Sequence, residues 1–238
     1  MIDVIIPVWN IERRGLWRVN YSCLSLSKCK GINKVIIVDG STNISTYSLE
    51  KEFKFVSVIP LKMPVFNKPR LLNIGIAFSQ SEYVMCTDCD YLFKPDLFEV
   101  CKKYRSPETM LFKKVIMLPN CNMTGERVNK WKFPRGTLNT WGTLANGAMQ
   151  YTTREWFKKN LHDERMYGWG AMDNMTAYKA VASGLKIKWV AESEILHIHH
   201  RNEKFRTKSD TERFNKNQEI LANFISEHKL PKLLKHGN

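Results

Sequence analysis

Short apolar runs alternate with amphipathic stretches over the first ninety or so residues. Between the first two of these runs, Val4–Val8 and Lys34–Asp39, the spacing predicts a helix from about Arg14 to Lys28. Between the last two, Pro69 suits a first helical turn, and the apolar positions that follow predict a buried helix face as far as Ser79. This alternation is typical of βα units and predicts an α/β fold with a mostly parallel, Rossmann-like central sheet flanked by helices. The runs with the composition of strands are Val4–Val8, Lys34–Asp39, Phe55–Ile59 and Tyr83–Thr87.

The pattern is less regular after Pro95. A helix is predicted from about Met172 to Ser183. Capping-box spacing occurs twice, at Thr152 with Glu155 and at Ser209 with Glu212. The second box precedes apolar residues at helical intervals, which predicts a C-terminal packing helix carrying Phe214, Leu221, Phe224 and Ile225. Further strands are predicted at Met110–Leu118, Gly147–Thr152, Lys186–Ala191 and Ile195–His199.

The length and composition suit a single soluble domain. A chain of 238 residues can bury a sizeable core without disulfides or metals, and its apolar runs are too short to span a bilayer. The first residues lack the basic and apolar regions of a signal peptide, so export by that route is not expected. The six cysteines are dispersed, which indicates reduced thiols and a cytoplasmic location.

A formal net charge of +14 indicates a polyanionic partner. Nucleic acid, an anionic membrane surface or a phosphorylated substrate could each supply the negative charge. No nucleic-acid-binding module is recognisable, so no specific nucleic acid is expected, and a diphosphate plus a loosely bound anionic surface explains the balance. The basic end of the chain, Lys229–His236, suits either peripheral contact with an anionic membrane or an acidic acceptor.

Three strand ends carry polar or turn-forming residues: Trp9 and Asn10, Asp39 to Ser41, and Asp88 to Asp90. In open α/β sheets, ligands bind beyond the carboxyl ends of the strands. The two carboxylates of Asp88 and Asp90 directly follow an apolar strand, where a hard divalent cation and a diphosphate could meet. The alternative is a solvated turn after a strand.

Three histidines occur within the segment 195–200. On a strand, His197 and His199 share one face and His200 takes the other. One of them could complete a metal site, and imidazole beside carboxylates favours Mn²⁺ over Mg²⁺. The alternative is a half-exposed strand end with ordinary surface histidines. Zinc is disfavoured because no ordered set of cysteine ligands accompanies them.

Asp173 follows a Gly-Trp-Gly turn at residues 168–170. Glycines permit a close backbone approach, and Trp169 offers a flat apolar face of the kind that stacks on a sugar ring. A carboxylate at this point could take a proton from an acceptor hydroxyl. The alternative is that Asp173 caps the following helix.

Five short motifs occur in a family order with the histidine segment last. The sequence resembles the GT-A glycosyltransferases over roughly Val4 to His200, particularly the family-2-like group and the C-terminal block shared by galactosyltransferases and polypeptide N-acetylgalactosaminyltransferases. The motifs are Ile5-Ile6-Pro7-Val8-Trp9-Asn10, Val38-Asp39-Gly40-Ser41-Thr42, Lys68-Pro69-Arg70-Leu71-Leu72-Asn73, Thr87-Asp88-Cys89-Asp90 and Gly168-Trp169-Gly170-Ala171-Met172-Asp173-Asn174.

The resemblance implies roles for particular residues. Asp88 would face the ribose or the metal and Asp90 would bind the metal, with His197 as the third protein ligand and His199 as the fallback. Arg70 would approach the diphosphate, and Asp173 would be the general base. The nucleoside would be cradled by Pro7, Val8, Trp9 and Asp39, and the sugar or acceptor would be contacted by Trp141, Asn146, Gly147 and Trp169.

The same resemblance implies the reaction and its organisation within one domain, residues 1–238. Residues 1–95 would form the nucleotide-binding half, 96–205 the acceptor-side half, and 206–238 the C-terminal helix and basic tail, and the fold would include a smaller acceptor-side subregion. The expected reaction transfers a sugar, with inversion and with Mn²⁺ or Mg²⁺, from a nucleotide-sugar donor, UDP by analogy, to a hydroxyl of a glycan or glycoconjugate. Met172 departs from the family, which often has an acidic residue there.

Two other interpretations fit parts of the sequence. Asp-x-Asp at a strand end also occurs in haloacid-dehalogenase-like phosphatases, but there Gly and Thr or Val usually follow, whereas Tyr91, Leu92 and Phe93 follow here. A basic sugar- or nucleic-acid-binding module could also keep a transferase fold without turnover.

Overall fold

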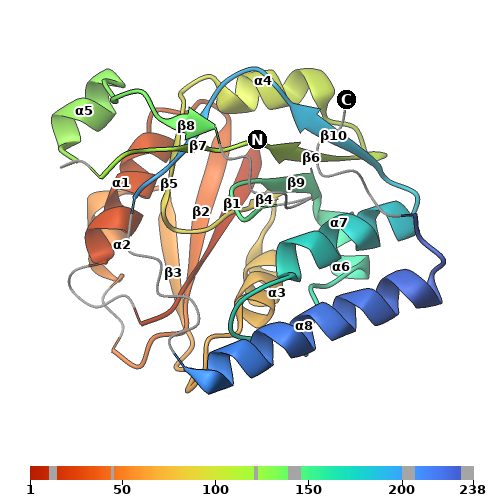
Figure 1. The fold of residues 1–238 in the computed structure, drawn as a ribbon. Helices are drawn as coiled ribbons and strands as arrows, with labels where there is room; N and C mark the ends of the chain where they lie inside the picture. The colour runs from red at the N-terminus through yellow and green to blue at the C-terminus, as the bar shows by residue number, and fades with distance from the viewer. Residues whose placement is uncertain (11–14, 44–45, 121–122, 139–145, 200–206, 232–238) are drawn as a thin grey trace.

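A seven-stranded sheet forms the centre of the protein (Figure 1). The computed structural model describes residues 1–10, 15–43, 46–120, 123–138, 146–199 and 207–231. Of the sheet's neighbouring pairs, only those of β9 with β4 and β6 are antiparallel, which confirms the mostly parallel sheet. The strands, in spatial order, are β10 (Lys186–Val190), β6 (Thr109–Lys113), β9 (Gln150–Thr153), β4 (Tyr83–Cys86), β1 (Ile2–Val8), β2 (Ile32–Asp39) and β3 (Val56–Pro60).

The central strand β1 is buried along its whole length because helices cover both faces of the sheet. Val4 and Ile6 pack in one cluster with residues of α1 and α4, whereas Ile5 packs in another with residues of α3, α6, α7 and α8. This alternation follows from the two-residue period of a strand. The helices are α1 (Leu16–Leu26), α2 (Ser48–Glu52), α3 (Lys68–Phe78), α4 (Leu97–Tyr104), α5 (Gly125–Lys130), α6 (Arg154–Lys159), α7 (Met172–Ala182) and α8 (Lys208–Glu227).

A second, four-stranded sheet brings the late histidine segment to the carboxylate motif. Its strands, in spatial order, are β5 (Tyr91–Phe93), β11 (Ile195–His197), β7 (Ile116–Met117) and β8 (Thr137–Leu138). Strand β5 begins directly after Asp90, and β11 pairs with it so that His197 lies opposite Tyr91. The backbone N–H of Ile198 then donates to the carbonyl of Asp90 at 2.9 Å. Two segments about a hundred residues apart are thereby joined beside Asp90.

Some predicted local features were wrong. The predicted strand Met110–Leu118 is two strands, β6 and β7, that belong to different sheets. Helix α6 is capped by Thr153, not by Thr152, because the hydroxyl of Thr152 is still in the sheet and donates to the carbonyl of Thr109. The capping box of α8 is Thr207 with Asp210, which places Ser209 inside the first turn. Helix α4, which follows Pro95, was not predicted.

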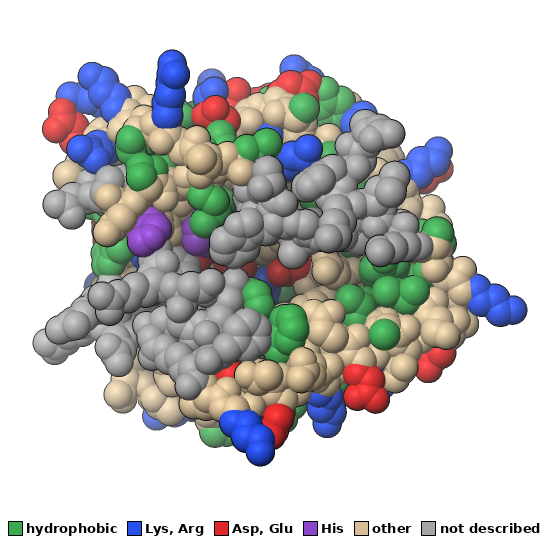
Figure 2. Space-filling model, viewed as in Figure 1, with side chains coloured by type: hydrophobic (Ala, Val, Ile, Leu, Met, Phe, Trp, Pro, Cys, Tyr) green, Lys and Arg blue, Asp and Glu red, His purple; other side chains and the backbone are tan. Residues whose placement is uncertain are grey.

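The surface and the helices bear on the expected contact with a membrane or another polyanionic partner. None of the described helices combines the length and apolar character needed to cross a membrane. On the face seen in Figure 2, Lys and Arg side chains are dispersed around the margin and do not gather in one patch. Most of the basic end of the chain lies outside the described residues, which end at residue 231. The described cysteines, Cys23, Cys29, Cys86, Cys89 and Cys101, are free thiols.

Candidate active site

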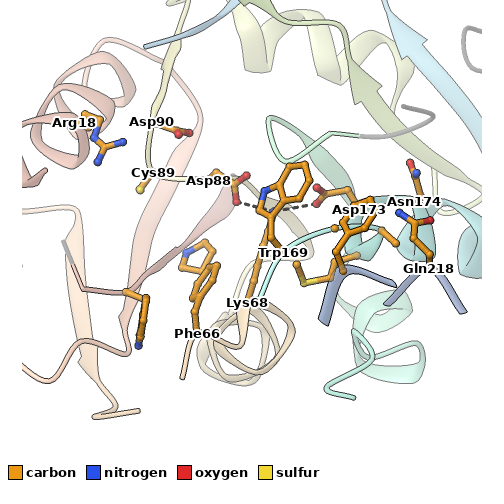
Figure 3. Close-up of a pocket in the computed structure, with 16 residues that line it drawn as sticks. Arg18, Phe66, Lys68, Asp88, Cys89, Asp90, Trp169, Asp173, Asn174 and Gln218 are labelled. Atoms are coloured by element: carbon orange, nitrogen blue, oxygen red, sulfur yellow. Dashed lines mark hydrogen bonds and ion pairs between the residues drawn. The ribbon is translucent and has the colours of Figure 1, made fainter. Parts of the chain in front are cut away.

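A pocket of about 460 Å³ opens beyond the carboxyl ends of β1 and β4, where the strand-end rule places a ligand. Figure 3 shows Arg18 and Asp90 at one end of it and Asn174 and Gln218 at the other. Asp88 lies between the two ends. The lining therefore combines carboxylates, amides, basic groups and aromatic rings from six separate parts of the chain, with Pro7, Trp9, Phe66, Lys68, Cys89, Trp169, Gly170, Ala171, Met172, Asp173 and Phe214 completing it.

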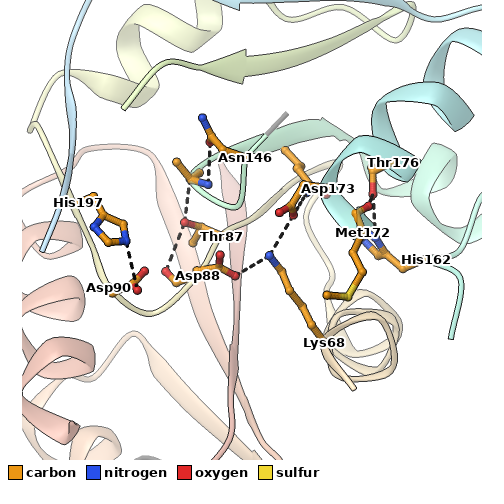
Figure 4. A network of polar contacts seen from close by, with 12 residues as sticks. Lys68, Thr87, Asp88, Asp90, Asn146, His162, Met172, Asp173, Thr176 and His197 are labelled. Carbon is orange, nitrogen blue, oxygen red and sulfur yellow. Dashed lines mark hydrogen bonds and ion pairs between the residues drawn. The ribbon is translucent and has the colours of Figure 1, made fainter. Parts of the chain in front are cut away.

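A buried lysine links the two sides of this pocket (Figure 4). Lys68 Nζ lies 2.7 Å from Asp88 Oδ1 and 3.0 Å from Asp173 Oδ1, and its side chain is 8% exposed. Burial alone would lower the pKa of Lys68, but the carboxylates of Asp173 and Asp88 outweigh it and raise the pKa. Lys68 therefore keeps its positive charge. It is held in place at the first turn of α3, where the Asn67 side chain accepts a hydrogen bond from the backbone N–H of Arg70 at 3.0 Å.

Asp173 is oriented by side chains and does not cap its helix. The N-cap position of α7 is Ala171, in the left-handed conformation with φ of 61°. Asp173 Oδ1 accepts hydrogen bonds from Lys68 Nζ at 3.0 Å and from Gln150 Nε2 at 2.7 Å. Both donors use the same oxygen, so within the described part of the chain Oδ2 is the carboxylate oxygen left to meet a ligand. The capping alternative for Asp173 is wrong.

Asp90 and His197 lie together, as the metal-site hypothesis requires. His197 Nε2 is 3.5 Å from Asp90 Oδ2, and their side chains are 17% and 15% exposed. His199 is exposed beyond the end of β11, and His200 lies outside the described residues. Asp88 is turned towards Lys68, and within the described ranges no group of three acidic, histidine or cysteine side chains could hold a metal ion. The structure thus joins an oxygen donor and a nitrogen donor.

Similarity to known proteins identifies the family of this chain. The sequence profile of the glycosyl transferase family 2 matches residues 3–166, which is more than half of the chain. The protein belongs to glycosyl transferase family 2. This confirms the family-2-like part of the resemblance inferred from the motifs and separates the chain from the haloacid-dehalogenase-like phosphatases, whereas the C-terminal block at residues 168–174 lies beyond the match and stays a prediction. A search of curated protein sequences gave no match.

Solved structures share the GT-A fold with this family 2 glycosyltransferase. S. aureus TarS 1-349 in complex with UDP-GlcNAc superposes with a TM-score of 0.69 at 15% identity, over 97% of this chain and 68% of TarS 1-349. GalNAc-T7 with UDP, GalNAc and Mn²⁺ gives 0.63 at 17% identity, over 96% of this chain and 50% of that one. Mannosyltransferase PcManGT from Pyrobaculum calidifontis, in complex with GDP-Man and Mn²⁺, gives 0.62 at 16% identity, over 85% and 58%.

The residues expected to bind the nucleoside in this glycosyltransferase are divided between the pocket and the core. Pro7 and Trp9 line the pocket. The Trp9 ring stacks on Phe66 with centroids 5.8 Å apart, and its Nε1 donates to the carbonyl of Met63 at 3.2 Å. The other three do not line the pocket. Val8 is buried in the core, and Asp39 is fully buried and accepts hydrogen bonds from the Ser41 N–H and the Thr46 hydroxyl. Arg70 is exposed to solvent. Their roles stay predictions.

Asn146 and Gly147 do not line the pocket but contact residues around it. Asn146 Nδ2 donates to the carbonyl of Lys113, and its Oδ1 accepts from the N–H of Ala148, each at 3.0 Å. A methyl group on Gly147 would lie 1.8 Å from Asp88 Oδ2, so only glycine lets Asp88 take its position. Trp141, the other residue expected to contact sugar here, lies outside the described residues.

Sequence reasoning missed the basic residues that line the pocket, Lys68 and Arg18. Lys68 stands directly before Pro69 at a predicted helix start, and Arg18 stands in the first helix after β1. Both positions adjoin the carboxyl edge of the sheet, which is a signal that could have found them. The expected basic residue, Arg70, is two positions from Lys68. That separation turns it away from the pocket, because successive helix positions differ by about 100°.

Proposed function

We propose that this glycosyltransferase transfers a sugar from a UDP-linked donor to a hydroxyl group of a glycan or glycoconjugate, with inversion at the anomeric carbon. The observation that carries the proposal is that Asp90, which lies beside His197, and Asp173, which accepts a hydrogen bond from Gln150, line one pocket. Support comes from the neighbours that share the fold: TarS was solved with UDP-GlcNAc and with UDP, and GalNAc-T7 with UDP and Mn²⁺.

In this proposal Asp90 and His197 hold a divalent cation, Mn²⁺ in preference to Mg²⁺. One carboxylate oxygen and one imidazole nitrogen are donors that would suit Mn²⁺. When bound, the cation supplies a Lewis acid for the charge that develops on the departing diphosphate. Asp88, which is paired with Lys68, lies next to this pair and would face the ribose.

Asp173 is the proposed general base. Its Oδ2 takes the proton of the acceptor hydroxyl as the acceptor oxygen forms a bond to the anomeric carbon. The bond from that carbon to the diphosphate breaks on the opposite face, and the electron pair leaves with the nucleoside diphosphate. Lys68 and Gln150 hold Oδ1, which fixes the direction of Oδ2. Attack from the face opposite the leaving group inverts the configuration without a covalent intermediate.

The first experiment is a screen of nucleotide sugars with Mn²⁺, in which release of the nucleoside diphosphate is measured with and without simple glycosides as acceptors. The Asp173→Asn variant should bind the donor normally but turn over about 10²- to 10⁴-fold more slowly, which is the scale of a general base. Asp96→Asn, an exposed change outside the pocket, is the matched control. Near-normal transfer by Asp173→Asn would show that the proton goes elsewhere.

The rival function is a non-catalytic binding module. This module would bind sugar or nucleic acid, and it would be favoured by a wild-type protein that releases no nucleotide from any donor and binds nucleic acid in a strongly salt-sensitive manner. Peripheral membrane contact through the basic tail is a separate prediction, and binding to vesicles with and without anionic lipid would test it.

A further inference from the structure

Helix α8 contributes two residues, Phe214 and Gln218, to the pocket lining. The family match ends at residue 166, so this helix lies beyond it. Phe214 was expected to pack in the core with Leu221 and Phe224. In the structure Leu221 and Phe224 do belong to the core cluster, whereas the Phe214 ring stacks on Trp169 at the pocket wall, with centroids 5.9 Å apart and planes 16° apart.

The junction between α8 and the Gly-Trp-Gly turn is specifically built. Gly170 has φ of 102°, and a methyl group there would lie 2.4 Å from a Phe214 ring carbon, so the ring rests directly on the glycine backbone. Asn217, which is 1% exposed, donates through Nδ2 to the carbonyls of Tyr167 and Trp169, each at 3.1 Å. A buried amide that satisfies two turn carbonyls fixes the helix to the turn. Phe214 and Trp169 are thereby held as one rigid aromatic wall.

The chemistry at this end of the pocket is that of carbohydrate recognition. Trp169 is 43% exposed, so it offers flat apolar surface to the C–H face of a sugar ring. Gln218 and Asn174 supply amides that can both donate to and accept from hydroxyl groups. No lysine or arginine belongs to this part of the described lining, residues 169–174 with Phe214 and Gln218, although the chain as a whole carries a charge of +14. An uncharged ligand fits this composition better than an anionic one.

We propose that Phe214, Gln218 and Trp169 form the subsite for the acceptor sugar and that this sugar is a neutral hexopyranose. This assignment rests on the proposed function, since the acceptor must approach Asp173, which borders this end. Figure 3 shows Gln218 and Asn174 on the far side of Asp173 from Asp90. The diphosphate end and the acceptor end are thus separated by the Asp88 and Lys68 pair. Helix α8 determines acceptor specificity.

The test compares acceptor kinetics of Phe214→Leu and Gln218→Ala with two matched controls on the same helix. Phe224→Leu makes the same aromatic change outside the pocket, and Asn215→Ala removes an exposed amide outside it. The acceptors are p-nitrophenyl glycosides of glucose, galactose, N-acetylglucosamine and glucuronic acid, with the donor found in the screen. Thermal unfolding of each variant establishes that it is folded.

The acceptor KM should rise about five- to tenfold for Phe214→Leu, the loss of one aromatic contact. For Gln218→Ala it should rise about three- to tenfold, the loss of one hydrogen bond. The rise should exceed any change in donor KM, the controls should match the wild type, and a neutral glycoside should be a better acceptor than the glucuronide. A larger effect on donor KM, equal losses in the controls, or preference for the glucuronide would overturn the proposal.

A second measurement separates this proposal from the proposed function. Saturation-transfer NMR detects binding of the same glycosides to the protein without any donor. Binding that is weakened in Phe214→Leu but not in Phe224→Leu supports the subsite even if no donor is turned over. Absence of glycoside binding to a wild type that does transfer sugar to another acceptor class would refute it and leave the proposed function intact.

Discussion

Replacing Lys68 with methionine tests the central electrostatic feature of the site. Methionine keeps the apolar stem of the side chain and removes the ammonium that lies between Asp88 and Asp173. Two carboxylates then face each other across the pocket without a cation. The change should lower the free energy of unfolding, because each carboxylate has lost water on folding and no longer lies beside the Lys68 ammonium.

The magnitude follows from burial. Removing one partner of a buried ion pair costs about 3–5 kcal/mol. Asp88 and Asp173 keep 32% and 27% of their side-chain exposure, which places the Lys68→Met variant near the lower limit. For a chain of this size 1 kcal/mol corresponds to about 2–4 °C, so Tm should fall by roughly 6–12 °C.

An ion pair of the same length but different burial provides the control. Lys102 Nζ lies 2.7 Å from Glu99 Oε1, as Lys68 does from Asp88, but their side chains are 43% and 50% exposed. Lys102→Met should lower Tm far less than Lys68→Met does, because an exposed ion pair is screened by water and contributes little to stability. Tm is measured by calorimetry for both variants and for Lys68→Met combined with Asp173→Asn, which should recover part of the loss. Equal losses for Lys68→Met and Lys102→Met would refute the argument that burial gives Lys68 its importance.

Two further predictions concern the metal and pH. Asp90→Ala should abolish the Mn²⁺ dependence of UDP binding in calorimetric titrations while Asp96→Ala retains it, and an unchanged affinity for UDP with Mn²⁺ would contradict the metal assignment. Burial lowers the pKa of His162 to about 3, whereas the ordinary pKa of histidine is about 6.5. Between these two pH values His162 binds a proton in the unfolded chain but not in the folded one. The free energy of unfolding should therefore fall by about 2 kcal/mol from pH 7.5 to pH 5 through this residue alone. In denaturant titrations, His162→Gln should remove that part of the pH dependence, whereas the control His228→Gln should keep it. Identical pH profiles of stability for the two variants would exclude this role of His162.

The sequence predicted the large sheet well and the small one poorly. Strand β1 and its neighbours β2, β3 and β4 are encoded by local apolar runs, and each fell within a residue or two of the predicted bounds. Strands β5 and β7 have three and two residues, too short to produce a periodic signal of their own. They exist because β11 pairs with both of them, and pairing between distant segments leaves no local pattern.

For the site, the sequence by itself determined that the carboxylates of Asp88 and Asp90 follow a strand and that the carboxylate of Asp173 follows a glycine turn. Only the tertiary structure decided how they are paired. It placed His197 rather than His199 beside Asp90 and set Lys68 between Asp88 and Asp173, residues separated by 20 and 105 positions from that lysine. The physical reason is that strand ends are dictated by local hydrophobic period, whereas ion pairs and ligand sets depend on side chains that meet only when separate elements pack together.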